Sequence, residues 1–230
     1  MPAIACQLKA GNSIEIGAGI VGKNKGAVET SGDLTATFVE NATLKAKGNI
    51  DINNGIIGSQ VYCDGALDVK VRRSRIVGST VRTATGITAF NVGSRFDTGT
   101  QLTTGIFPEK EKSYLNIKKT LDTRWGEAKE LEKRYGRSTL ENKSFSRNIS
   151  DAVKRDIDKW DFLKKQIKTI IGHLKKAEEE MYDHGVIIRI KETLYPRVEL
   201  QIGKHKITAS KEYFDVKVLY SEEAGKIVIK

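Results

Sequence analysis

The sequence predicts a mainly β protein: a right-handed, single-stranded β-helix, followed by an antiparallel coiled-coil hairpin and a small C-terminal β region that packs at the end of the β-helix. Three observations support this prediction. Short glycine-bearing phrases recur in residues 11–93, the hydrophobic period lengthens after Glu109, and strand-like alternation resumes after Gly185. We expect domains at residues 1–107, 108–184 and 185–230.

The repeated phrases in residues 11–93 are of two kinds. The first is apolar-apolar-Gly, and the second is Gly, then a polar or small residue, then an aliphatic residue. Successive copies are about 16 to 21 residues apart, which indicates stacked units. Glycine supplies the positive φ or the close backbone approach that a corner needs. Copies of the first kind are Ile20-Val21-Gly22, Ile56-Ile57-Gly58 and Ile76-Val77-Gly78, and copies of the second include Gly32-Asp33-Leu34, Gly48-Asn49-Ile50 and Gly65-Ala66-Leu67.

One such unit cannot bury its inward side chains alone. Alternating aliphatic pairs such as Ile14/Ile16 and Ile50/Ile52 place every second side chain on one face of a strand. We therefore expect about five coils, stacked so that their inward side chains form a continuous apolar column. The irregular coil length favours a right-handed helix, since left-handed ones usually keep a strict hexapeptide repeat.

A helical period begins near Pro108, which suits the first turn of a helix. Apolar residues then recur every three or four positions until Gly136, and again from Ser150-Asp151 onward. Two such seams joined by a polar loop predict an antiparallel coiled-coil hairpin, in which Lys164 interrupts the second seam. We expect the seam aromatics to lie in the core. The seams are Tyr114, Ile117, Leu121, Trp125, Ala128, Leu131 and Tyr135, and Val153, Ile157, Trp160, Ile167, Ile171, Leu174 and Met181.

The alternating runs after Gly185 are short and are separated by turn signals at Gly203 and Gly225. A hairpin returns its ends to nearly the same place, so we expect these strands to lie beside the last coil and to cap its open edge. The runs are Val186–Ile190, Val198–Ile202, Lys206–Thr208, Asp215–Val218 and Lys226–Ile229.

Composition and charge limit the classes of function that the chain can have. The 230 residues carry 39 Lys and Arg against 29 Asp and Glu, and the net charge of +10 is spread over all three predicted domains. A solvated basic surface is therefore favoured over a nucleic-acid-binding domain. The sequence shows no leader and no membrane-length apolar run, and Cys6 and Cys63 lack metal-ligand spacing. We expect a cytoplasmic protein without membrane insertion.

We expect a non-enzyme with no catalytic, metal-binding or cofactor-binding residues. A β-helical acyltransferase needs a histidine on a coil, but none occurs before His173. Asp51, Asp64 and Asp68 lie near arginines and imitate a calcium-dependent lyase, yet outward polar residues on rungs are the favoured interpretation. No glycine phrase has the Lys-Ser/Thr ending of a phosphate loop.

The densest basic patch is Val71-Arg72-Arg73-Ser74-Arg75. It lacks the stacking aromatic residues of a single-stranded nucleic-acid site, so a contact with a protein partner, or merely a soluble surface, is favoured over RNA binding. The tip of the predicted hairpin is a second natural contact surface. The possible partner-binding residues are Arg72, Arg73, Arg75, Arg137, Lys143 and Arg147.

Longer motifs are spread over essentially the whole chain. They are Phe38-Val39-Glu40-Asn41-Ala42, Arg75-Ile76-Val77-Gly78, Phe90-Asn91-Val92-Gly93-Ser94 with Thr100 and Gly105, and Leu194-Tyr195-Pro196 before Val198-Glu199-Leu200. In this order, with a helical hairpin between the last two, they resemble the flagellar assembly protein A (FapA) family. The order is more specific than any one motif.

The resemblance implies a right-handed β-helix and a cytoplasmic, non-enzymatic scaffold or regulator that contacts protein partners, such as flagellar assembly or cell-pole factors. Oligomers remain open. The family usually carries a further N-terminal domain, which is not found in this sequence. Ser79 stands where a second Gly is common, and Arg197 replaces the Gly that usually follows Tyr-Pro and suits a type II turn.

Two other functions stay open. A self-assembling β-helix of the bactofilin or division-inhibitor kind would polymerise end to end, although the hairpin and tail should block one end. An RNA-binding arm protein would use the basic hairpin, and its affinity would fall steeply with salt.

Overall fold

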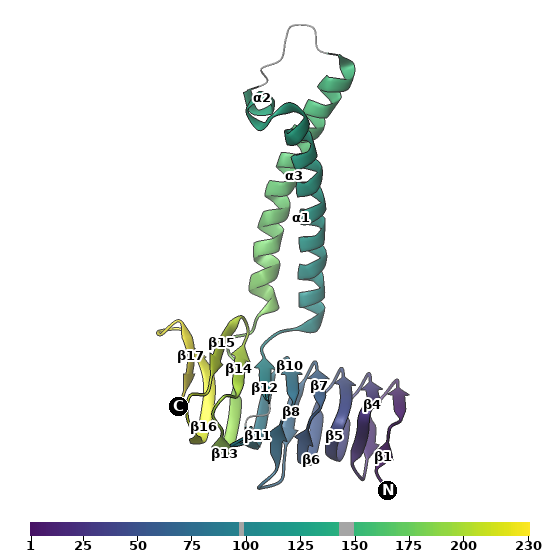
Figure 1. Ribbon diagram of the computed structural model, residues 1–230, viewed down its shortest axis with the longest axis vertical. Helices are drawn as coiled ribbons and strands as arrows, with labels where there is room; N and C mark the ends of the chain where they lie inside the picture. Colours follow the sequence, from purple (N-terminus) through teal and green to yellow (C-terminus); the bar gives the residue numbers. More distant parts are fainter. Residues whose placement is uncertain (97–98, 143–149) are drawn as a thin grey trace. The chain divides into compact units, whose positions relative to one another are not determined.

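A computed structural model describes residues 1–96, 99–142 and 150–230. The chain divides into two compact units (Figure 1). One unit comprises residues 1–108 and 182–230 and is built of β-strands, and the other comprises residues 109–181 and is helical. No helix in the described residues is long and apolar enough to cross a membrane.

The strands of the first unit wind into a β-helix with three strand segments per turn. Within the described residues from Ile14 to Thr104 the turns number about five, and each segment pairs in parallel with its counterpart one turn later. The mainly β fold of stacked coils is confirmed, whereas its handedness remains a prediction. The strands are β1 (Ala3–Ile4), β2 (Gln7–Ala10), β3 (Ile14–Ile16), β4 (Ile20–Thr30), β5 (Leu34–Ala46), β6 (Ile50–Ile57), β7 (Gln60–Cys63), β8 (Ala66–Val69), β9 (Arg75–Val77), β10 (Thr80–Thr83), β11 (Gly86–Val92) and β12 (Gln101–Thr104).

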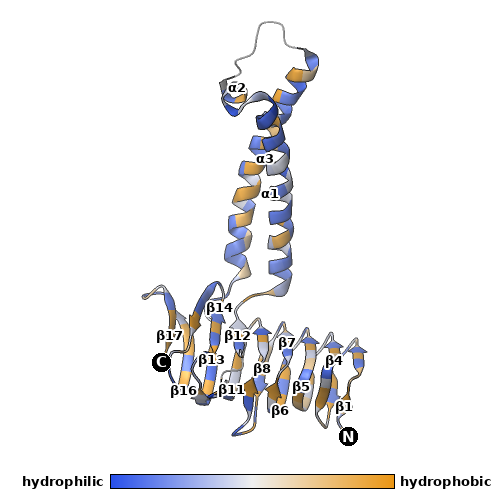
Figure 2. Ribbon diagram, viewed as in Figure 1, coloured by the Kyte–Doolittle hydropathy of each residue, from blue (hydrophilic) through white to orange (hydrophobic). Residues whose placement is uncertain are grey.

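Inward side chains stack from turn to turn into continuous apolar columns. Apolar and hydrophilic residues alternate along the strands, which Figure 2 shows as orange and blue bands. In one column, each side chain is the direct neighbour of the next through paired strands, and all but the first are almost completely buried. That column is Leu8, Val28, Leu44, Val61, Val81, Leu102 and Leu200.

Gly58 and Gly78 form equivalent corners, each with a φ of +59°, as the repeated phrase predicts. The serine after each glycine adds a hydrogen bond between turns. Ser59 Oγ accepts from an amide of the preceding turn at 3.2 Å, and Ser79 Oγ accepts from the Ser59 amide at 3.1 Å. Thr100 Oγ1 extends this hydroxyl ladder by accepting from the Gly78 amide at 2.9 Å. These hydroxyls are buried, so losing one would leave an amide unpaired.

Gly22, in the first copy of the phrase along the chain, is required for a different geometric reason. A Cβ at this position would lie 2.3 Å from the Asn41 carbonyl oxygen on the next turn. The positive φ angles at this corner belong to Lys23 and Asn24, at 48° and 60°. The three copies therefore share a place in the stack but not one backbone conformation.

After the helical unit, the chain returns to the β-helix. β13 (Ile188–Leu194) and β14 (Glu199–Ile202) pair in parallel with β11 and β12 and add a further rung. β15 (His205–Thr208), β16 (Tyr213–Ser221) and β17 (Lys226–Ile229) are antiparallel. Because β15 pairs with β14 and β16 pairs with β13, the antiparallel strands cover the last parallel rung.

Arg197 occupies the backbone conformation that a glycine would favour. Its φ is 66°, and its amide donates to the Ala209 carbonyl at 2.7 Å. The turn after Pro196 therefore forms with arginine in a left-handed conformation, which costs a non-glycine residue about 1–2 kcal/mol.

The two ends of the helical insertion meet within the β unit. The Asp183 amide donates to the Gly105 carbonyl at 2.9 Å, and Ile106 forms an isolated antiparallel bridge with Tyr182. The chain therefore leaves after β12 and re-enters at β13 without disturbing the stacking of successive rungs.

The helical unit contains α1 (Pro108–Tyr135), α2 (Arg137–Asn142) and α3 (Asp151–Met181). As predicted, α1 stops at Gly136, whose φ is +80°, and α3 starts after Ser150, whose Oγ accepts from the Val153 amide at 3.4 Å. The polar loop predicted after Gly136 is wrong over its first residues, because α2 forms there around the fully buried Leu140.

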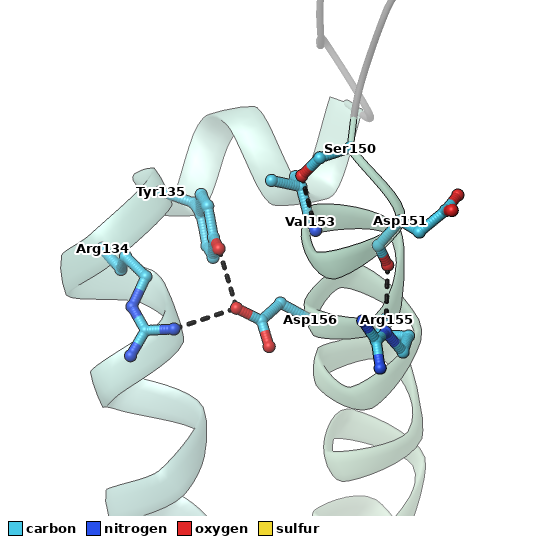
Figure 3. Close-up of polar contacts among 7 residues, drawn as sticks. All are labelled: Arg134, Tyr135, Ser150, Asp151, Val153, Arg155 and Asp156. Atoms are coloured by element: carbon cyan, nitrogen blue, oxygen red, sulfur yellow. Dashed lines mark hydrogen bonds and ion pairs between the residues drawn. The ribbon is translucent and has the colours of Figure 1, made fainter.

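Asp156 of α3 connects the two long helices (Figure 3). Its carboxylate accepts from the Tyr135 hydroxyl at 2.7 Å and from Arg134 Nη1 at 2.9 Å. These contacts, that of Tyr135 above all, hold the pKa of Asp156 below its usual range. Glu127 and Lys159 form a second cross-pair at 3.9 Å, and the order of the two pairs makes α1 and α3 antiparallel. Their classification as a coiled coil remains a prediction.

The predicted seams need two corrections. Trp125 is not a core residue, since 45% of it is exposed, and Arg124 is half-buried one position earlier. Lys164 does not interrupt the second seam, because Leu163 takes the buried position and Lys164 Nζ lies outside, 4.4 Å from the centroid of the Trp160 ring. The buried core of the unit is Ala128, Leu131, Leu140, Ile157, Trp160 and Leu163.

Candidate binding sites

The predicted basic patch of the β-helix lines a pocket of about 400 Å³. Arg73 and Arg75 come from the turn into β9, and Arg95 joins them from the segment after β11. We call this the arginine pocket. Its neutral polar side chains are Asn91, Ser94 and Tyr195.

A tight turn sets Arg73 and Arg75 on either side of a buried residue. The amide of buried Ser74 donates to the Val71 carbonyl at 3.0 Å and closes the turn. The φ of Arg73 is 68°, a conformation that costs a non-glycine residue about 1–2 kcal/mol. Such backbone strain clusters at binding sites.

Glu192 supplies the carboxylate of the pocket. It lies at a β-bulge, where β13 has one residue more than β11 between paired positions. Its oxygens accept from Asn91 Nδ2 at 2.8 Å and from Arg72 Nε at 3.0 Å, and these contacts hold the pKa of Glu192 below its usual range. Arg72 is thus engaged, whereas Arg73 and Arg75 form no ion pair with any described residue.

The structure brings the three predicted β-helix residues together but separates them from the predicted tip residues. Arg137 lies in α2 of the helical unit, and Lys143 and Arg147 fall outside the described residues. The sequence interpretation missed Arg95 and Asn91. The repeat spacing could have found Asn91, because it pairs with Arg75 one turn earlier.

A second hollow, of about 350 Å³, lies in the helical unit between α1 and α3. Its apolar lining is Trp125, Ala128, Ile167 and Ile171. We call it the Trp125 groove. Since Trp125 is the exposed aromatic on its wall, the groove offers apolar surface to an incoming side chain.

The rim of the Trp125 groove is basic. Arg137 Nε and Lys164 Nζ both contact Glu141 Oε1, at 3.1 Å and 3.3 Å, and hold the pKa of Glu141 below its usual range. Lys129, Lys168 and the acidic Glu132 complete the charged lining, and neither lysine forms an ion pair with a described residue. Apolar surface and an excess of positive charge therefore lie side by side.

Outside the two hollows, burial shifts the pKa values of Cys63 and His184. In the part of the chain that the structure describes, no three His, Cys, Asp or Glu side chains group to hold a metal ion. Burial raises the pKa of the Cys63 thiol to about 12, which suppresses its reactivity. Burial and the nearby charge of His205 lower the pKa of His184, whose ring centroid is 5.4 Å from that of His205.

Comparison with known proteins gives one match. The model of the Flagellar Assembly Protein A beta solenoid domain matches residues 4–227. No curated protein and no solved structure matches the chain.

Proposed function

Because the chain belongs to the flagellar assembly protein A family, we propose that it is a non-enzymatic scaffold or regulator of flagellar assembly that works in the cytoplasm through protein contacts. The family match spans both compact units, which supports a role for the whole chain. The antiparallel strands over the last rung disfavour the alternative, an end-to-end β-helix polymer, because they occupy one stacking edge.

The observation that carries the proposal of protein contacts is the Trp125 groove. A partly exposed tryptophan beside an apolar floor is typical of the residues that dominate binding energy at interfaces. The uncompensated Lys129 and Lys168 favour an acidic occupant. The proposed partner presents an amphipathic helix whose apolar side chains enter the groove and whose carboxylates meet its rim.

Complementation of a deletion strain tests this proposal. The strain receives the full chain, Trp125→Glu or Leu115→Glu, and flagella are counted by electron microscopy alongside swimming radius. Losing a tryptophan anchor weakens an interface by about 2 kcal/mol or more, roughly thirtyfold in affinity. Leu115 is the matched control, because it is 54% exposed on the same helix and does not line the groove.

We expect the full chain and Leu115→Glu to restore flagella and Trp125→Glu to fail, with equal helical content of both purified variants by circular dichroism. Normal flagella in the deletion strain would refute the flagellar role. Full activity of Trp125→Glu, or equal loss in both variants, would refute the groove as the partner site while leaving the flagellar role standing.

A further inference from the structure

We propose that the arginine pocket binds a phosphate group carried by a small ligand. All residues that line the pocket belong to the β unit, whereas those that line the Trp125 groove belong to the helical unit. The pocket therefore gives the chain a second binding activity, separate from the proposed protein contact and independent of the flagellar role.

Among the described residues that line it, the arginine pocket has three arginines and one acid, Glu192. Glu192 is already bonded to Arg72 and Asn91, and Arg95 has an ion pair with Glu212 at 3.5 Å. The backbone of Arg73 is hydrogen-bonded to Glu192, but the guanidinium groups of Arg73 and Arg75 form no ion pair with a described residue. An anion that enters the pocket would thus meet guanidinium groups that no carboxylate occupies.

The donor set suits phosphate better than a single carboxylate. Guanidinium groups donate paired N–H bonds that match two oxygens of one phosphate, and two such groups can serve a dianion together. The hydroxyls of Ser94 and Tyr195 add neutral donors, whereas the amide of Asn91 already donates to Ser74 and Glu192. A hollow of about 400 Å³ is of the size that holds small ligands.

The position of Glu192 makes it possible to test the proposal with two variants whose phosphate affinities should change in opposite directions. The Glu192 carboxylate lines the same pocket and repels an incoming anion, although the ion pair with Arg72 partly offsets its charge. Glu192→Gln removes that charge at nearly constant shape, and its amide oxygen can still accept from Asn91. Phosphate affinity should therefore rise in Glu192→Gln and fall in Arg75→Gln.

Isothermal titration calorimetry on the full chain at low ionic strength measures both changes. The probes are inorganic pyrophosphate, adenosine monophosphate, and vesicles that contain phosphatidic acid. We expect Arg75→Gln to weaken binding by about tenfold or more and Glu192→Gln to tighten it by about fivefold. Lys45→Gln, which removes an exposed charge on β5 outside the pocket, should leave the affinity unchanged.

Each outcome of the titration either supports or overturns the proposal. Pyrophosphate or nucleotide binding with this pattern supports a soluble phosphate ligand, and binding of vesicles alone with the same pattern supports a lipid headgroup. Absence of binding to all three probes overturns the proposal. Equal weakening by Arg75→Gln and Lys45→Gln, or no gain in Glu192→Gln, also overturns it, because diffuse surface charge would then explain the binding.

Discussion

Truncating Leu44 to alanine should destabilise the β unit far more than the same change at Leu8, although both belong to one apolar column. Leu44 is 0% exposed and has a neighbour in the column on both sides. The lost transfer free energy is about 2.4 kcal/mol, at about 0.8 kcal/mol for each carbon removed, and the cavity raises the total to about 4 kcal/mol. Collapse around the cavity is restricted, because backbone ladders fix the distance between turns.

Leu8 gives the matched comparison. It is 38% exposed and has a column neighbour, Val28, on one side only. Less apolar surface returns to water, and the space left by the side chain opens to solvent instead of forming a cavity. We expect a cost of about 1 kcal/mol. Leu102, at 0% exposed between Val81 and Leu200, should behave like Leu44 because β14 covers it.

Urea unfolding followed by circular dichroism at strand wavelengths measures these differences. The midpoint should fall strongly for Leu44→Ala and Leu102→Ala and slightly for Leu8→Ala, at constant slope. Equal midpoints for Leu8→Ala and Leu44→Ala would refute the reasoning that stacking on both sides sets the cost. A small effect of Leu102→Ala alone would show that the strands after the helical unit do not seal the column.

Three further predictions concern single side chains. Alkylation of the native protein should modify the half-buried Cys6 and spare Cys63, whose burial raises its pKa to about 12; mass mapping that finds Cys63 labelled first would contradict this. Burial, and to a smaller extent the charge of His205, lowers the pKa of His184 in the folded chain. As the pH falls below about 6.5, His184 is therefore protonated in the unfolded chain before it is protonated in the folded chain. The free energy of unfolding should therefore fall more between pH 7 and pH 5 in the wild type than in His184→Gln. If the urea midpoints of both proteins fall by the same amount, His184 is not the cause of the pH dependence. Arg197→Gly should raise stability by about 1 kcal/mol by relieving a φ of 66°, with Arg197→Ala, which keeps the strain, as control; a gain in both would point to the side chain instead.

The repeat pattern was sufficient to predict the coils, because each repeated phrase reflects the backbone conformation or close packing that a corner needs at that position. Gly58 and Gly78 do adopt one φ, and the strands predicted after Gly185 appear as β13 to β17. The hydroxyl ladder was not predicted. A serine after a glycine is common in turns, and only the stacked turns show that Ser59 and Ser79 serve the same bond at successive levels.

The helical unit shows where periodicity fails. Residues three or four positions apart both lie on the same face of a helix, so the spacing did not distinguish Arg124 from Trp125 as the buried residue. Hydrophobicity favoured the tryptophan. The exposed position of Trp125 is what makes it a candidate contact residue. The arginine pocket needed the fold for a different reason, since Glu192 follows the helical segment and is far from Arg75 and Arg95 in the chain.

The hydrogen bond between Gly105 and Asp183 bears on how such chains can diversify. It holds the exit and the return of the helical segment at one point, so the rungs on either side are stacked as if the chain were continuous. Whole helical turns can then be gained or lost in α1 and α3 together while every rung keeps its partner. Evolution can therefore change the length of the helices without changing the strand pairing of the β-helix.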